Sequence, residues 1–254
     1  MPNNTSYDAT AYVGAAPRRT TGMITQNSLA QADYTVDMVF CIDATGSMED
    51  FSGTQTKIIN MVKKNALNFY NDFNRKMAEK RKQVHQLRVR IIAFRDYRAD
   101  GDQAMMVTDF FNLPQQDREF EACINSIHAD GGGDIPEDGL EALAYAIKSK
   151  WTTEGVKKRQ VIVVWTDAGT HDLGFGAASP SYPKGMPRDM GELSTWWYGM
   201  NKSYKRLLIF APNEPGWSYI SDSWDNVVHV TSVSGNGLAE KSYEDILNNI
   251  ANSV

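Results

Sequence analysis

Two runs of apolar residues in this chain of 254 residues each end directly on an aspartate. Residues 38–42 lead into Asp43, and residues 160–166 lead into Asp167. A continuous apolar run of this length is typical of a parallel strand that is covered on both faces of its sheet. The two runs therefore predict strands at the centre of a buried sheet, each followed by a carboxylate.

Strand patterns alternate with helical patterns along the rest of the chain. Strands are expected at residues 34–42, 87–94, 104–111, 160–166, 206–211 and 227–230. Apolar residues at three- and four-residue steps predict helices at residues 58–77, 114–127, 140–147, 193–197 and 244–253, with Pro114 opening the second. The alternation predicts an α/β fold with a mostly parallel, six-stranded sheet flanked by helices. Because binding sites in such sheets form at the carboxyl ends of strands, Asp43 and Asp167 are expected at one edge.

The composition is that of an ordinary globular chain, with 42% hydrophobic and 22% charged residues. A net charge of −5 provides no general attraction for phosphate, so we expect no nucleic-acid partner. Residues 1–32 are polar and predict a flexible tail before a single domain at 33–254. Neither a secretory signal nor a run of 18 apolar residues is present, so we expect a cytoplasmic protein that does not bind membranes. Two cysteines, Cys41 and Cys123, are too few for a disulfide framework and are expected to be free thiols.

Hydroxyl side chains follow Asp43 at alternate positions, Thr45 and Ser47. If the loop is extended, residues at i, i+2 and i+4 point the same way, so one loop can present three oxygen ligands to one ion. Carboxylate and hydroxyl oxygens suit Mg²⁺ or Mn²⁺, and Ca²⁺ is also compatible with them. Neutral hydroxyl ligands leave a cation strongly electrophilic toward an outside carboxylate. The pattern therefore predicts a metal site that binds an acidic ligand.

Three segments carry a family resemblance. Asp43-Ala44-Thr45-Gly46-Ser47-Met48 resembles the metal-ion-dependent adhesion site (MIDAS) of von Willebrand factor A (VWA) domains, whose pattern is Asp-x-Ser/Thr-x-Ser. The second metal loop of that family is similar to Gly132-Gly133-Asp134-Ile135-Pro136-Glu137, and the third to Trp165-Thr166-Asp167-Ala168. The resemblance spans about residues 34–253 and is closest to stand-alone intracellular VWA proteins. It implies a doubly wound, Rossmann-like fold.

The resemblance also implies roles for individual residues. The metal ligands would be Asp43, Thr45, Ser47, Glu137 and Asp167, with the two aspartates bound directly or through water. Asp134 would brace its loop or lie near an accessory ion. Asp50 would line an adjacent cation site, although the next position, acidic in integrin β-type domains, is Phe51 here.

Each motif also has a simpler structural interpretation. Thr45 or Ser47 could cap a following helix, and Asp134 and Glu137 could be acids in a first helical turn. Asp167 could be a turn residue.

Other polar segments are weaker candidates. Arg95-Asp96 is expected to form a structural ion pair, and His171-Asp172 to lie in a plain loop. The four histidines show no spacing of zinc ligands.

We expect a binding module rather than an enzyme, because no nucleophile is arranged with a base and an orienting third residue. The metal would accept a carboxylate from a partner protein, in an intracellular complex or a stress or signalling system. One alternative is a metal-dependent phosphatase-like hydrolase of the haloacid-dehalogenase kind. Those enzymes need a second aspartate where this chain has Thr45. The other alternative is a structural assembly subunit whose metal is incidental.

Overall fold

The two apolar runs form neighbouring strands at the centre of one sheet. β1 (Ala32–Asp43) and β5 (Lys157–Trp165) run parallel, with Phe40 beside Val163. Alternate residues of β1 enter the cores on opposite faces, since Phe40 belongs to one core and Cys41 to the other. Burial on both faces explains why residues 38–42 of β1 and 161–165 of β5 are apolar without interruption.

The computed structural model describes residues 32–49, 58–234 and 243–254. They belong to one unit, Gln31–Val254. The tail expected at residues 1–32 lies outside the described residues except for Ala32, which begins β1.

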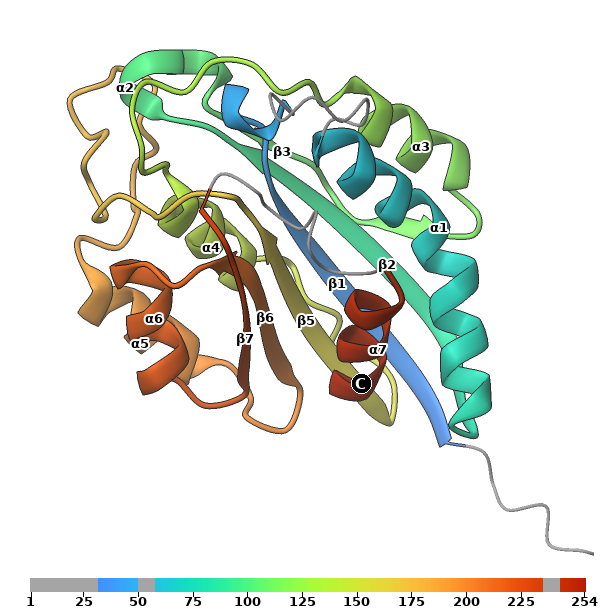
Figure 1. Ribbon diagram of the computed structural model, residues 1–254. Helices are drawn as coiled ribbons and strands as arrows, with labels where there is room; N and C mark the ends of the chain where they lie inside the picture. Colours follow the sequence, from blue (N-terminus) through green and yellow to red (C-terminus); the bar gives the residue numbers. More distant parts are fainter. Residues whose placement is uncertain (1–31, 50–57, 235–242) are drawn as a thin grey trace, which may run out of the picture. The chain divides into compact units, whose positions relative to one another are not determined.

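The sheet is mostly parallel, as predicted, but it has seven strands rather than six. Its order is β3-β2-β1-β5-β6-β7, with β4 also paired to β2 (Figure 1). The outer strands are β2 (Lys82–Phe94), β3 (Met105–Val107), β4 (Phe111–Leu113), β6 (Lys205–Pro212) and β7 (Val227–Ser232). The strand order reverses at β1, because β2 lies on one side of it and β5 on the other. In such sheets a crevice forms beyond the carboxyl ends of the strands at this point.

The seventh strand arises because residues 104–111 do not form one strand. β3 and β4 are separate segments, both antiparallel to β2. Between them, the Thr108 amide donates to Ile91 O at 3.0 Å, while the Ile91 amide donates to the Thr108 hydroxyl at 3.0 Å rather than to a backbone carbonyl. The single strand expected there was therefore wrong.

Helices cover both faces of the sheet (Figure 1). One face holds α1 (Ile58–Glu79), α3 (Asp117–Ser126) and α7 (Tyr243–Ser253). The other holds α4 (Gly139–Ile147), α5 (Met190–Gly199) and α6 (Pro215–Ser223). The shorter turns are η1 (Gly46–Met48), α2 (Tyr97–Asp100) and η2 (Gly101–Gln103).

Two details of the helices differ from expectation. Pro114 does not open α3, which begins three residues later at Asp117. α6 was not expected, although it begins on Pro215 and buries Trp217 and Ile220. Cys41 and Cys123 are free, as predicted. None of the helices in the described ranges is long and apolar enough to cross a membrane.

Candidate metal centre

Asp43 is fully buried at the end of β1, and three hydrogen bonds hold its carboxylate. The Thr45 amide and hydroxyl donate to Oδ1 at 2.9 and 2.6 Å. The Thr166 hydroxyl, just after β5, donates to Oδ2 at 2.6 Å. Asp43 therefore links the loops that follow the two central strands. Thr166 was not among the predicted site residues.

A chain of oxygen atoms continues from Thr45 to Asp167. The Thr45 and Ser47 hydroxyl oxygens lie 3.1 Å apart, and Ser47 Oγ donates to Asp167 Oδ1 at 2.9 Å. Thr45 has the expected extended backbone and stands before η1, but its side chain makes no capping hydrogen bond. The capping interpretation of Thr45 is therefore wrong, because its hydroxyl binds the cluster instead. Ser47 is half-buried, whereas Thr45 and Asp167 are buried.

Glu137 approaches this cluster from a third loop. Its backbone joins the loop after β5, since the Glu137 amide donates to Gly169 O at 3.3 Å and the His171 amide donates to Glu137 O at 2.8 Å. A Cβ atom on Gly132 would lie 3.0 Å from Glu137 Oε1 and 3.2 Å from Thr45 Cβ. The two side chains therefore flank Gly132. Glu137 precedes α4, which begins at Gly139. The interpretation of Glu137 as an acid in a first helical turn is therefore wrong.

Backbone hydrogen bonds hold the second loop against the first. The Gly46 amide donates to Gly131 O at 3.0 Å, and the Asp130 amide donates to Ala44 O at 3.0 Å. Gly132 has φ +79°, a conformation that glycine adopts readily and other residues rarely. The glycine run thus lets the backbone approach Thr45 closely.

The buried carboxylates of the cluster have atoms without hydrogen-bond partners. Glu137 Oε2 and Asp167 Oδ2 make no hydrogen bond, although Glu137 is only 3% and Asp167 only 1% exposed. Burial raises the pKa of Glu137 to about 9, and the charges of Asp43 and Asp96 add to the effect. Burial and the charge of Asp167 raise the pKa of Asp43 to about 6. A divalent cation would neutralise these charges and engage the two free oxygens, so the residues fit a Mg²⁺ or Mn²⁺ site.

Two accessory residues were also predicted, Asp50 and Asp134. Asp50 is outside the described residues. Asp134 has a 60% exposed side chain, and its Oδ1 lies 3.6 Å from His171 Nε2.

A second group of buried polar side chains was missed in the sequence. Ligand atoms of Asp96, Asp138 and His171 all lie within 4.8 Å of one another. Arg95 does not form the ion pair expected with Asp96, because its guanidinium donates to the carbonyls of Ala44, Gln103 and His128 at 2.8–3.0 Å. The one available signal was that Asp96, like Asp43 and Asp167, follows a strand.

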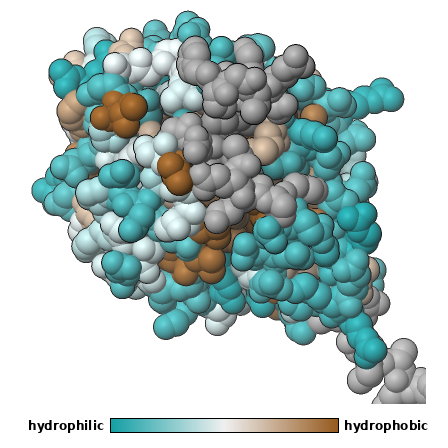
Figure 2. Space-filling view, viewed as in Figure 1, coloured by the Kyte–Doolittle hydropathy of each residue, from teal (hydrophilic) through white to brown (hydrophobic). Residues whose placement is uncertain are grey.

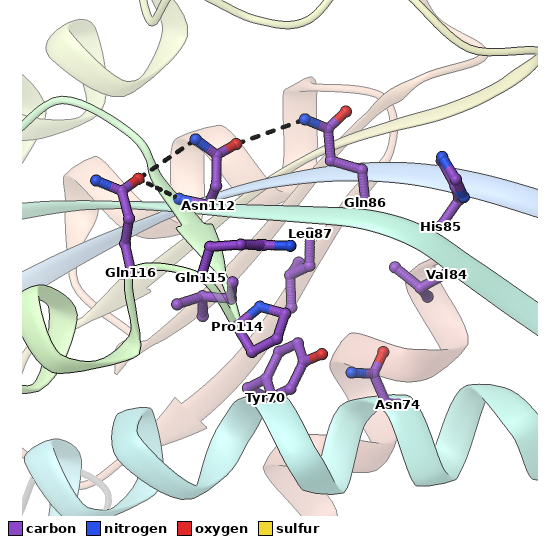
Figure 3. A pocket seen from close by; sticks show the side chains of 11 residues that line it. Tyr70, Asn74, Val84, His85, Gln86, Leu87, Asn112, Pro114, Gln115 and Gln116 are labelled. Carbon is purple, nitrogen blue, oxygen red and sulfur yellow. Dashed lines mark hydrogen bonds between the residues drawn. The ribbon is translucent and has the colours of Figure 1, made fainter.

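One pocket lies far from these carboxylates along β2. It has a volume of about 560 Å³ and is lined around residues 84–87 of β2, whereas the metal cluster adjoins the other end of the strand (Figure 3). Asn112 contacts Gln86 and Gln116 there through side-chain hydrogen bonds. The lining of the pocket includes no acidic side chain, so the pocket offers no carboxylate ligand to a cation.

Comparison with known proteins finds one partial relative and no family. No family model matches the chain. The alpha-protein kinase vwkA of Dictyostelium discoideum is 27% identical over 157 residues, which are 62% of this chain and 22% of that protein. This chain therefore spans less than a quarter of the length of that relative.

Solved structures with a similar fold include two bacterial pilus proteins. The PilB minor pilin from Streptococcus sanguinis has a TM-score of 0.54 and 15% identity, covering 85% of this chain and 61% of that one. The pilus adhesin SpaC from Lactobacillus rhamnosus GG has a TM-score of 0.52 and 16% identity, covering 86% of this chain and 30% of that one. At these identities the similarity concerns the fold alone.

Proposed function

We propose that the chain is a VWA-type binding module whose MIDAS holds Mg²⁺ or Mn²⁺ and captures a carboxylate of a partner protein. The observation behind the proposal is that three hydrogen-bonded loops carry two buried carboxylate oxygens without hydrogen-bond partners, Glu137 Oε2 and Asp167 Oδ2. Asp43, Thr45 and Ser47 complete the proposed ligand set.

Some residues of the proposed site would bind the metal, and others orient the ligands. Asp43 has both oxygens engaged by hydroxyl or amide donors, so it orients Thr45 and Thr166 and would reach the metal directly or through water. Ser47 is the half-buried member and would lie on the side that a partner approaches. When bound, the cation would offer a coordination position to a carboxylate oxygen of the partner.

The face of the molecule in Figure 2 is largely hydrophilic, with apolar side chains in separate patches. Recognition through a charge on a metal needs no large apolar surface. A cytoplasmic complex remains part of the proposal.

We do not propose an enzyme. The half-buried hydroxyl of Ser47 donates to the Asp167 carboxylate, and the nearby imidazole of His171 contacts Asp96 and Asp134 rather than a hydroxyl. The kinase name of the relative belongs to a protein of which this chain matches 22%. Mg²⁺-dependent hydrolysis of a generic phosphate ester that is abolished in Asp43→Asn would overturn the binding proposal in favour of a hydrolase.

The first test is thermal unfolding with and without Mg²⁺ or Mn²⁺. A ligand at a hundredfold its Kd adds about 2.7 kcal/mol, which raises the Tm of a domain of this size by about 5–10 °C. We expect this rise in the wild type and in Asp172→Asn, an exposed control. In Asp167→Asn the rise should disappear while the metal-free Tm is maintained, because the amide can still accept the Ser47 hydrogen bond. An equal rise in both variants would exclude Asp167 from the site.

A further inference from the structure

The group formed by Asp96, Asp138 and His171 lies beside the proposed MIDAS but shares no residue with it. Asp96 follows β2, Asp138 precedes α4 and His171 lies in the loop after β5. Their exposed fractions are 1%, 0% and 5%, and their ligand atoms lie within 4.8 Å of one another. Three loops thus bring two carboxylates and an imidazole together in the interior.

The two carboxylates each accept a backbone hydrogen bond, and the imidazole packs on an aromatic ring. Asp96 Oδ1 accepts from the Arg98 amide at 2.5 Å, and Asp138 Oδ2 accepts from the Tyr97 amide at 2.7 Å. The His171 ring stacks on Phe175, with ring centroids 3.8 Å apart.

The remaining atoms of the group lack ordinary hydrogen bonds. Asp138 Oδ1 and His171 Nε2 have no hydrogen-bond partner, and Nε2 lies 3.5 Å from Asp96 Oδ2. Buried polar atoms without a partner are costly, and such an atom in a native fold calls for an explanation.

We propose that Asp96, Asp138 and His171 bind a second divalent ion, a transition metal with Zn²⁺ as the first choice. An imidazole nitrogen with carboxylate oxygens is a ligand set that suits Zn²⁺, whereas the all-oxygen MIDAS suits Mg²⁺ or Mn²⁺. The two sites therefore differ in the metal that each prefers. The exposed carboxylate of Asp134, 3.6 Å from His171 Nε2, is available as a further ligand from the solvent side.

The second ion would hold the loops that carry the MIDAS ligands. Asp138 is the neighbour of Glu137, and His171 follows Asp167 by four residues. An ion between Asp138 and His171 would thus fix the spacing of the two loops and position Glu137 and Asp167. This positioning role rests on the proposed function, whereas the zinc site itself does not.

The test is calorimetric titration of the full chain with Zn²⁺ in saturating Mg²⁺. We expect one tight equivalent in the wild type and at least about tenfold weaker binding in His171→Gln and Asp138→Asn, each of which removes a ligand. The exposed His85→Gln is the matched histidine control and should bind like the wild type. Asp167→Asn should also retain Zn²⁺ while losing the Mg²⁺-dependent Tm rise, so failure of the MIDAS proposal is separable from failure of this one.

X-ray absorption of the Zn²⁺-loaded wild type makes the test independent of how the variants fold. We expect imidazole scattering and nitrogen or oxygen ligands at about 2.0–2.2 Å. Circular dichroism establishes whether each variant is folded before its titration is interpreted. A spectrum without imidazole scattering, or Zn²⁺ binding undiminished in folded His171→Gln, would overturn the site. His171 would then only lie close to Asp96 and Asp134 without binding a metal.

Discussion

Ser47 Oγ donates a hydrogen bond of 2.9 Å to Asp167 Oδ1 across a separation of 120 residues. The bond joins the loop after β1 to the loop after β5, where the strand order of the sheet reverses. Asp167 is buried and Ser47 is half-buried, so the serine is the member of the pair nearer to solvent. Its oxygen keeps a lone pair that a cation can use while the proton remains directed at Asp167.

Ser47→Ala should weaken Mg²⁺ binding by about 10–100-fold, since it removes one neutral ligand and releases Asp167 from its donor. The metal-free protein should lose only about 1 kcal/mol, the usual net contribution of one hydrogen bond. Calorimetric titration measures the first effect and urea unfolding in chelator measures the second.

The matched control is Ser221→Ala, a half-buried serine of α6 that donates to the Ser218 carbonyl at 2.9 Å. Its metal affinity should equal that of the wild type. Equal affinity in Ser47→Ala as well would remove Ser47 from the ligand set.

Gly132→Ala should weaken both the fold and the metal site. The left-handed backbone at φ +79° costs an alanine about 1–2 kcal/mol. In addition, the new Cβ would lie 3.0 Å from Glu137 Oε1 and 3.2 Å from Thr45 Cβ, so it would push two proposed ligands apart. Urea unfolding and Mg²⁺ titration measure the two effects.

Gly174→Ala separates backbone strain from the collision. Gly174 has φ +83°, but a Cβ there meets nothing within 4 Å. It should therefore show a loss of stability of similar size with an unchanged affinity for Mg²⁺. If both variants bind Mg²⁺ as tightly as the wild type, contact at Gly132 does not control the site.

The central strands could be predicted because their composition records burial on two faces. β1 and β5 lie inside the sheet, and residues 38–42 and 161–165 face a layer of helices on each side, so they are apolar. Residues 104–111 have a similar apolar character, but their pairing with β2 is interrupted between Val107 and Phe111. Propensity alone cannot show that interruption, because it depends on the partner strand.

Of the two candidate sites, one could be predicted from a local motif and the other could not. Asp43, Thr45 and Ser47 belong to one local motif, so a shared site could be expected from the sequence, although the loop is extended only as far as Thr45 and Ser47 lies in the 3-10 turn η1. The approach of Asp96, Asp138 and His171 depends on how three distant loops fold onto one another. No local spacing encodes it, and a search for histidine pairs passes over a site with a single histidine.

The raised pKa values of the cluster predict how stability depends on pH. The pKa of Glu137 is raised from its ordinary 4.5 to about 9, and that of Asp43 from 3.8 to about 6. Between the unfolded and folded values of each pKa, the folded chain binds more protons than the unfolded chain. The free energy of unfolding in chelator should therefore fall as the pH rises from about 5 to about 9.

Metal binding should show the opposite trend, because a cation must displace the proton of Glu137. Mg²⁺ affinity should rise by about tenfold per pH unit for each displaced proton over this window. Saturating Mg²⁺ should accordingly reduce the loss of stability at high pH. Urea unfolding at a series of pH values, with chelator and with Mg²⁺, measures both trends.

Glu137→Gln assigns the effect to one residue. Without a titratable carboxyl at this position, the metal-free stability should become nearly independent of pH between about 7 and 9, where only Glu137 of the two still titrates. Glu121→Gln, on the exposed face of α3, should keep the wild-type slope. A wild-type slope in Glu137→Gln would mean that another buried acid holds the proton, and Asp138, whose pKa burial raises to about 7, would be the next to test.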